Sequence, residues 1–292
     1  MTEGRVVKAL SGFFYVQAGE EIYTCTSSGK LKYGNTVPLV GDRVGISVSS
    51  GLTGSVESIL PRSNSLIRPA VANIDCMVFL ASNVNPVTDP LLIDRMSVIA
   101  EYLGCEFVLI INKMDLTEKD VFGKIYEDIG YKVFRTSAAE NTGIKETDSY
   151  LRGKTSVLTG NSGVGKSSIL NAINPRLSLK TGEVSEKLGR GKHTTRHVEM
   201  FEIAPETFII DTPGFASFDI SMISAIKSSE LQGCMKEFSP FIGSCRYSDC
   251  NHISEPGCSV REAVKEGSIS ESRYASYRKL FEFLKDSEAR QY

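Results

Sequence analysis

Three short motifs constrain this chain more than any other feature, and their order is unusual. Residues 160–167, with the sequence GNSGVGKS, fit the phosphate-binding P-loop pattern G-x-x-x-x-G-K-S. Asp211 opens DTPG, a pattern typical of a sensor for Mg²⁺ and a γ-phosphate. Asn112 opens NKMD, a pattern typical of a loop that reads a guanine base, and it precedes the P-loop.

In an ordinary GTPase the P-loop opens the domain and the base-reading motif follows the sensor. Here the cyclic order of the motifs is the same, but the starting point differs. This order indicates that the domain was cut after the sensor and rejoined across its former termini. We therefore expect a circularly permuted P-loop GTPase domain with a doubly wound α/β sheet.

The P-loop is expected to bind the phosphates of GTP or GDP. Its glycines let backbone N–H groups close around phosphate at a helix N-terminus, where the helix dipole adds attraction. Lys166 should lie along the β- and γ-phosphates and assist catalysis, while the Ser167 hydroxyl should hold Mg²⁺. The residues expected around the phosphates are Gly160, Asn161, Ser162, Gly163, Val164, Gly165, Lys166, Ser167 and Ser168.

The NKMD motif is expected to select guanine. The carboxylate of Asp115 can accept hydrogen bonds from N1 and N2 of guanine, which adenine cannot supply. The loop is formed by Asn112, Lys113 and Met114, which precede Asp115 in the motif. We expect Asn112 and Lys113 to buttress this loop and to stack over the base. The dipeptide Ser137-Ala138 follows another strand-like run, where a backbone N–H should meet guanine O6.

The remaining catalytic candidates lie between the P-loop and the sensor. Asp211 follows an apolar run and should hold Mg²⁺ through water, and Gly214 should offer an N–H to the γ-phosphate. Residues 189–196 interleave glycines with basic and hydroxyl residues, which is typical of a mobile switch loop, although a solvated basic loop is an alternative. We expect Thr195 to complete the Mg²⁺ shell, with Thr194 as the next candidate.

The residue after the sensor predicts slow unaided hydrolysis. Many GTPases place a water-orienting Gln there, but this chain has Phe215. Another group must then position the attacking water. His193 is the nearest candidate by sequence, and a structural or RNA-contacting role for this histidine is equally open.

The rest of the pattern predicts a multi-domain α/β protein. Residues 1–62 carry short strand-like runs separated by Gly and polar turns, which predict a small β-barrel of SH3-like or OB type, or simply a structural cap. Residues 63–221 alternate buried strands with helices, including a helix over 90–103, and form the predicted GTPase domain. Residues 222–292 are expected to be helical, ending in a helix whose apolar stripe packs inward.

The four strand-like runs of residues 1–62 lie at 12–16, 21–25, 42–48 and 53–59.

A compact Cys/His cluster lies within the C-terminal part. Cys245, Cys250, His252 and Cys258 supply three thiolates and one imidazole, the composition of a closed tetrahedral zinc site. We therefore expect one Zn²⁺ per chain.

Composition excludes several classes of protein. No stretch approaches the roughly 20 apolar residues that span a membrane, and the N-terminus lacks the apolar core of a signal peptide. Seven cysteines, an odd number, disfavour a disulfide framework. We expect a cytoplasmic monomer that has no membrane association. The net charge of −2 gives no overall signal for nucleic-acid binding.

Taken together, these motifs closely resemble the RsgA (YjeQ/YloQ) family of circularly permuted GTPases. The resemblance covers the barrel, the order NKMD, SA, GNSGVGKS, HTT, DTPG, and the cluster C-x4-C-x-H-x5-C. It implies an N-terminal OB-fold and a GTPase that is stimulated by the small (30S) ribosomal subunit during its late maturation. It also implies a zinc domain that contacts ribosomal RNA, and it favours His193 as a catalytic residue.

One rival function stays open at this point. The chain could be a nucleotide-gated RNA-binding scaffold whose hydrolysis is incidental; a metabolic P-loop kinase is disfavoured by NKMD.

In the permuted order the sensor runs directly into the C-terminal domain. Loss of the γ-phosphate contact at Gly214 could therefore move that domain.

Overall fold

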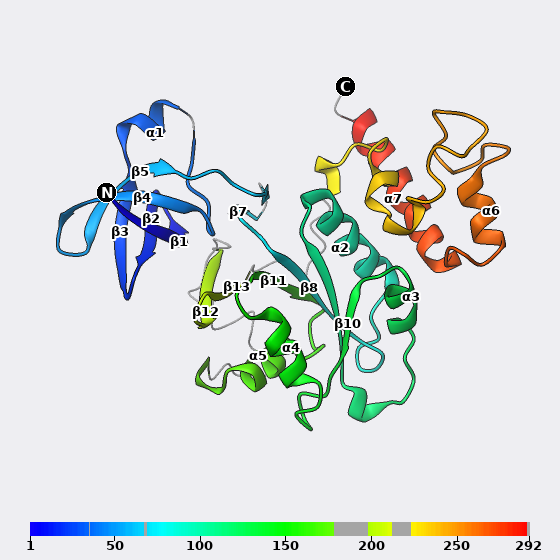
Figure 1. Cartoon of the computed structure of the whole chain (residues 1–292), viewed down its shortest axis with the longest axis horizontal. Coiled ribbons are helices and arrows are strands. Elements are labelled where there is room, and N and C mark those ends of the chain that lie inside the picture. The colour runs from blue at the N-terminus through cyan, green and yellow to red at the C-terminus, as the bar shows by residue number, and fades with distance from the viewer. Residues whose placement is uncertain (35, 67–68, 178–197, 212–222, 291–292) are drawn as a thin grey trace.

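The computed structural model describes residues 1–292 except 35, 67–68, 178–197, 212–222 and 291–292. An N-terminal barrel, a central sheet with helices, and a C-terminal group of helices and loops follow one another across the molecule (Figure 1). In the described part of the chain, no helix combines the length and the apolar character that crossing a bilayer requires.

The N-terminal part is a five-stranded barrel. Its strands are β1 (Thr2–Leu10), β2 (Phe13–Ala18), β3 (Glu21–Ser27), β4 (Arg43–Ser50) and β5 (Thr53–Ile59), with the short helix α1 (Gly29–Tyr33) between β3 and β4. They pair in the order β1-β2-β3-β5-β4, and β1 also pairs with β4, which closes the barrel. The closed five-stranded Greek-key arrangement is that of the OB-fold.

The sequence pattern missed one barrel strand. Only the four runs between residues 12 and 59 were expected, whereas the structure adds β1 and gives it two partners within the barrel. Its sequence, TEGRVVKAL, mixes charged and small residues, and only Val6 and Val7 are buried. Such a strand shows little alternation, so the pattern alone gave no signal.

The central sheet has the strand order β10-β9-β8-β11-β13-β12. Its parallel strands are β8 (Cys76–Ser82), β9 (Glu106–Asn112), β10 (Lys132–Arg135), β11 (Thr155–Gly160) and β13 (Thr207–Asp211), and β12 (Glu199–Ala204) is antiparallel. β8 lies beside β11 and precedes it in the chain. The half of the sheet that an ordinary GTPase builds last is thus built first, as the motif order predicted.

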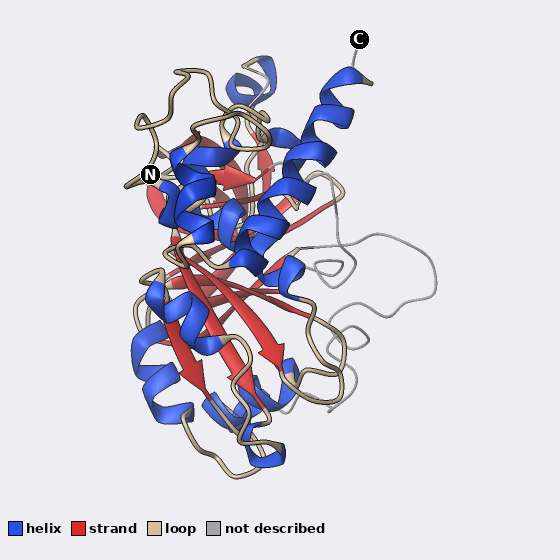
Figure 2. Cartoon of the chain, turned by 90° about the vertical axis from the view of Figure 1, so that its right-hand side faces the viewer, coloured by secondary structure: helices blue, strands red, loops and turns tan. Residues whose placement is uncertain are grey.

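Helices cover both faces of this sheet. α2 (Pro90–Leu103) and α3 (Gly123–Asp128) lie on one face, and α4 (Ile144–Leu151) and α5 (Lys166–Ile173) on the other. Met77 and Phe79 of β8 pack with α2, whereas Val78 and Leu80 pack with α4 and α5. This alternation is the doubly wound arrangement. Figure 2 shows strands of the sheet with their arrowheads toward the same end.

Helix α2 has the residue limits that its sequence predicts. Asp89 caps its N-terminus by accepting a hydrogen bond from the backbone N–H of Leu91, and Pro90 occupies the first turn. Gly104 ends the helix in the left-handed conformation, with φ of 66°. Both ends are therefore well defined, and α2 packs between the sheet and the C-terminal part.

The C-terminal part contains the 3₁₀ turns η3 (Ile223–Ala225), η4 (Leu231–Cys234) and η5 (Lys236–Phe238) and the helices α6 (Ser259–Lys265) and α7 (Glu271–Ala289). Between Ala225 and Ser259, a stretch that the structure describes throughout, the chain forms 3₁₀ turns and loops but no α-helix. Helical character is therefore more limited than expected. The apolar stripe of α7 does pack inward, because Tyr277, Leu280 and Leu284 are buried.

The barrel adjoins the central sheet at β12. A bridge between Lys8 of β1 and Glu199 of β12 links the two sets of strands. The Arg5 guanidinium donates to Thr155 Oγ1 at 2.7 Å and lies over the ring of Phe208. The connection after β5 is also held in place, since Arg62 forms a 2.7 Å ion pair with the buried Asp42.

Candidate functional site

The predicted nucleotide motifs converge at one edge of the sheet. β9 ends in Asn112, β11 leads into the P-loop, and β10 is followed shortly by Ser137. These strands are parallel, so their carboxyl ends lie at the same edge. The order of connections also reverses between β8 and β11, and ligands of doubly wound sheets bind at such a point.

Asn112 joins the base-reading loop to the phosphate loop. Its side-chain Nδ2 donates to the backbone oxygen of Val164 in the P-loop at 2.9 Å. Its Oδ1 accepts from the backbone N–H of Ala138 at 3.2 Å and from the Thr136 hydroxyl at 3.2 Å. The residue is buried, at 3% exposure. One amide side chain thus connects three loops, and each loop carries a predicted nucleotide contact.

The Asp115 carboxylate is held in place by its neighbour in space. The Ser137 hydroxyl donates to Asp115 Oδ1 at 2.5 Å and itself accepts from the backbone N–H of Glu140 at 3.1 Å. This leaves Oδ2 of Asp115 as the oxygen to which no hydrogen bond is assigned among the described residues. In the Ser137-Ala138 dipeptide, where a backbone N–H is expected to meet guanine O6, the backbone N–H of Ala138 donates to Asn112 Oδ1.

Lys113 and Met114 contact a loop that the motif analysis did not single out. Lys113 has a left-handed backbone, with φ of 67°, and its ammonium donates to the backbone oxygen of Asn85. The Asn83 amide contacts the Met114 sulfur at 3.9 Å. Asn83 and Asn85 both follow β8, the central parallel strand, and that position is the signal that could have identified them.

The P-loop glycines are required by close approach as well as by conformation. A Cβ on Gly160 would lie 2.4 Å from the backbone oxygen of Leu80, and one on Gly165 would lie 2.3 Å from Asn112 Nδ2. Both glycines have positive φ, 142° and 100°. The Lys166 ammonium donates to the backbone oxygens of Gly160 and Asn161, at 2.6 and 2.8 Å. The lysine therefore lies within the loop that it is expected to serve.

The Mg²⁺ side of the predicted site is described only in part. Ser167 is buried in the first turn of α5, and Asp211 ends β13, the strand next to β11. His193, Thr194, Thr195, Gly214 and Phe215 lie outside the described residues. Ser167 therefore follows strand β11, and Asp211 ends the neighbouring strand β13.

The four predicted metal ligands come together. One ligand atom from each of Cys245, Cys250, His252 and Cys258 lies within 4.8 Å of all the others. His252 Nδ1 is 3.5 Å from the Cys245 sulfur and 3.3 Å from the Cys258 sulfur. Three thiolates and one imidazole at this spacing fit a tetrahedral Zn²⁺ ion.

Gln232 orients the imidazole of this cluster. Its side-chain oxygen is 2.8 Å from His252 Nε2, so that nitrogen carries the proton and Nδ1 is left with a lone pair toward the sulfurs. Burial lowers the pKa of His252, which favours the neutral, ligating form. Gln232 is the kind of outer partner that metal-bound histidines use, and the motif did not reveal it.

Glu255 orders the loop between the last two ligands. Its carboxylate accepts from the backbone N–H groups of Asn251, Ile253 and Ser254 at 2.8–2.9 Å. Burial raises the pKa of Glu255, but these backbone donors outweigh it and bring the pKa to about 2. The loop is thus preorganised by an ionised carboxylate that is not itself in the Cys/His cluster.

Two family models match this chain. The model described as the RsgA GTPase matches residues 59–221, and the model described as the RsgA N-terminal domain matches residues 3–56. The first match includes the NKMD, P-loop and DTPG motifs, and the second includes most of the barrel.

Full-length relatives and solved structures agree with these matches. Proteins named small ribosomal subunit biogenesis GTPase RsgA are 40% identical in Alkaliphilus metalliredigens (98% of each chain covered) and 41% identical in Caldanaerobacter subterraneus (99% of this chain, 98% of the relative). The crystal structure of YjeQ from Thermotoga maritima matches with a TM-score of 0.81 at 38% identity, covering 97% of this chain and 98% of that one. The structure of YloQ, described as a circularly permuted GTPase, matches with a TM-score of 0.79 at 33% identity, covering 98% and 96%. The chain therefore belongs to the RsgA family of circularly permuted GTPases.

Proposed function

We propose that this protein assists late maturation of the small (30S) ribosomal subunit, hydrolysing GTP to GDP and phosphate when the subunit stimulates it. The family and the names of the full-length relatives support the partner. The observation that carries the nucleotide part is the clamp at Asn112, which ties the P-loop to the base-reading loops. Such a clamp suits a ligand that has both a base and a phosphate chain.

Guanine would be bound by the loops at the ends of β9 and β10. Asp115 would accept from N1 and N2 of the base, and its hydrogen bond with Ser137 supports that orientation. Asn112, Lys113 and Met114 would form the loop that frames the base. For Ala138 to donate to guanine O6, its N–H must turn from Asn112 Oδ1 or be shared with it.

The phosphates and their metal would be bound at the start of α5. Residues 160–168 would surround the phosphates, with Lys166 released from its loop carbonyls to reach the β- and γ-phosphates. Ser167 and Thr195 would hold Mg²⁺ directly, and Asp211 would hold it through water. Bound Mg²⁺ would neutralise charge that develops on the phosphate oxygens.

Turnover would depend on residues outside the described part. Gly214 would donate to the γ-phosphate, and His193 would position the attacking water because Phe215 offers no amide for that task. We propose that the subunit orders the loop around residues 189–196 and so brings His193 and Thr195 into place.

The N-terminal barrel and the C-terminal domain would bind the subunit. We assign residues 1–62 to an OB-type barrel, 63–221 to the GTPase domain and 222–292 to a zinc-binding domain. One Zn²⁺ held by Cys245, Cys250, His252 and Cys258 would stabilise the last domain, and the ligand distances support this. The barrel and the zinc domain would both contact ribosomal RNA.

The experiment that tests this function compares the GTP hydrolysis rate with and without purified small subunits. Stimulation supports the proposal. If subunits bind in a GTP-dependent way but leave the rate unchanged, the protein is a nucleotide-gated RNA-binding scaffold whose hydrolysis is incidental.

A further inference from the structure

A buried cluster of charges joins the C-terminal part to helix α2. Arg273 of α7 is only 1% exposed. Its guanidinium lies 2.7 Å from Asp94 of α2 and forms two hydrogen bonds, of 2.7 and 3.1 Å, with Glu237 of η5. It also donates to the Ser97 hydroxyl of α2 at 2.9 Å.

This cluster makes the interface between α2 and the C-terminal part sensitive to the loss of a single side chain. Burial alone would lower the pKa of Arg273, but the carboxylates of Asp94 and Glu237 raise it well above its ordinary range. The Tyr126 hydroxyl of α3 donates to Asp94 at 2.5 Å as well. Removing the arginine would leave the buried carboxylates of Asp94 and Glu237 without this cation, and uncompensated buried charge is strongly destabilising.

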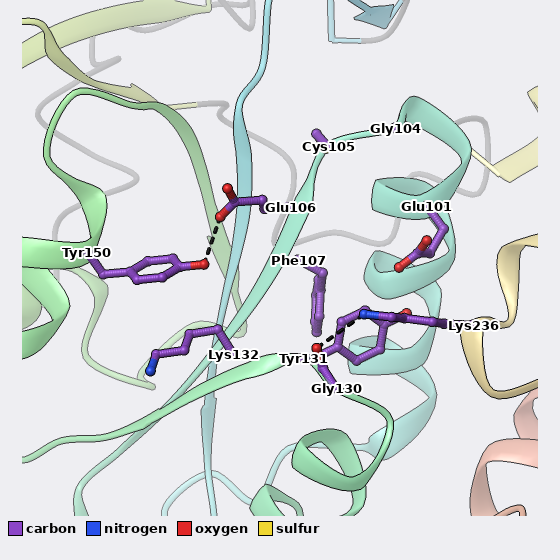
Figure 3. A pocket seen from close by; sticks show the side chains of 10 residues that line it. All are labelled: Glu101, Gly104, Cys105, Glu106, Phe107, Gly130, Tyr131, Lys132, Tyr150 and Lys236. Carbon is purple, nitrogen blue, oxygen red and sulfur yellow. Dashed lines mark hydrogen bonds between the residues drawn. The ribbon is translucent and has the colours of Figure 1, made fainter.

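Further contacts extend the interface between the C-terminal part and the central domain along α2 and the adjacent sheet edge. Val98 of α2 is buried in the apolar core of the C-terminal part. Lys236, next to Glu237, donates to the backbone oxygen of Gly130 at 3.1 Å and lies over the ring of Tyr131. Figure 3 shows Lys236 reaching across a pocket toward this glycine and tyrosine, with Glu101 of α2 on the adjoining wall. The two parts are therefore held by charge, packing and main-chain contact.

The N-terminal end of α2 is connected to the predicted guanine site. The loop that follows β8 contacts Lys113 through the Asn85 carbonyl and Met114 through the Asn83 amide. A few residues later the same loop reaches Asp89, which caps α2. Asp94 and Ser97 then lie on the first two turns of the helix. Lys113 and Met114 are thus linked through one short loop to the helix that contacts Arg273.

We propose that α2 couples nucleotide occupancy to the C-terminal domain through Arg273, in addition to the direct chain connection after the sensor. Arg273 acts as a positioning residue and does not touch the nucleotide. The inference rests on the proposed GTP-binding function. Coupling of this kind is reciprocal, so whatever restrains the C-terminal domain must change nucleotide affinity by the same factor.

The test is hydrogen–deuterium exchange of the full chain with and without GDP, followed in peptides from α2 and α7. For the wild type we expect GDP to slow exchange in both helices by about fivefold or more, the lower end of usual coupling between sites. Arg273→Met should keep the GDP response of α2 and lose that of α7. Lys279→Met, an exposed change on α7, should retain both responses.

A milder variant covers the case in which Arg273→Met does not fold. Tyr126→Phe removes only the hydroxyl that contacts Asp94, and it should reduce the α7 response without abolishing it. The proposal is overturned if GDP binds to the wild type but leaves α7 exchange unchanged. It is equally overturned if the folded variants respond like the wild type. A wild type that does not bind GDP at all would instead contradict the proposed function.

Discussion

The side-chain amide of Asn112 donates to the backbone oxygen of Val164 over 2.9 Å, across 52 positions of the chain. This bond ties the loop expected to read the base to the loop expected to hold the phosphates. Gly165 leaves the space for it, since a Cβ there would lie 2.3 Å from the donating nitrogen. We therefore expect that base affinity and phosphate affinity are not independent in this fold.

Asn112→Ala should weaken GTP and GDP binding together. The change leaves the Val164 carbonyl and the Ala138 N–H without this partner, and an unsatisfied buried polar group costs about 1–3 kcal/mol. Titration calorimetry checks the two affinities. Asn64→Ala is the matched control, because Asn64 also bonds two backbone groups, both of Ile74, but far from the site. Equal effects of the two substitutions on nucleotide affinity would contradict the role of the clamp.

Asp115→Asn should weaken GTP binding by about 1–3 kcal/mol, because the amide presents a donor where guanine already presents donors. Xanthosine triphosphate, with an oxygen at position 2, should recover part of the lost affinity. Competition binding with a fluorescent nucleotide measures both effects. Asp128→Asn, an exposed change on α3, is the control. Equal affinity of the wild type for ATP and GTP would exclude guanine selection by this loop.

Cys250→Ala should abolish stoichiometric zinc and loosen the C-terminal domain. Metal binding energy at such a site is largely folding energy, so the effect should be seen in thermal unfolding as well as in metal content. Cys234→Ala is the matched control: Cys234 is buried in the same apolar core but is not among the four clustered ligands. Mass spectrometry of protein purified without chelator measures the metal. A wild type with no zinc would argue decisively against this site.

Gln232→Leu should weaken zinc retention without removing any ligand. The substitution takes away the oxygen that accepts from His252 Nε2, and loss of such a partner costs about 10–100-fold in metal affinity. Gln232→Glu keeps an oxygen acceptor and should restore most of the affinity. Competition with a chelating dye gives the dissociation constants. Identical constants for Gln232→Leu and the wild type would show that the imidazole is oriented by other means.

Much of the central domain could be predicted from the sequence. β8 and β9 each contain a continuous apolar run, and helix α2 has a capping Asp, an early Pro and a terminal Gly, so the helix has the limits expected, residues 90–103. The motif order also predicted the circular permutation of the domain, which the match to YloQ supports. These features are local, and each is specified by adjacent residues.

The features that were missed depend on distant partners. Arg273 is one of many charged residues of α7, and its partner Asp94 is 179 positions away, so the sequence does not show that this arginine is buried in an ion pair. Strand β1 is stabilised by pairing with β2 and β4 more than by burial of its own side chains. The role of Gln232 is revealed only by the packing of η4 against His252, one of the predicted zinc ligands. In each case the tertiary contact, and not the local pattern, determines the role.

Control of GTP hydrolysis by the small subunit is the core of the proposed function. The most direct measurement is the single-turnover hydrolysis rate of the full chain, with purified small subunits added or left out. We expect slow turnover of the protein alone and a large acceleration by subunits, since positioning of this kind reaches about 10⁵-fold in activated GTPases. His193→Ala should depress the stimulated rate far more than GTP affinity, whereas Lys166→Ala should damage both. A rate of about 1 s⁻¹ or faster without subunits, unchanged when they are added, would show that the subunit does not control hydrolysis.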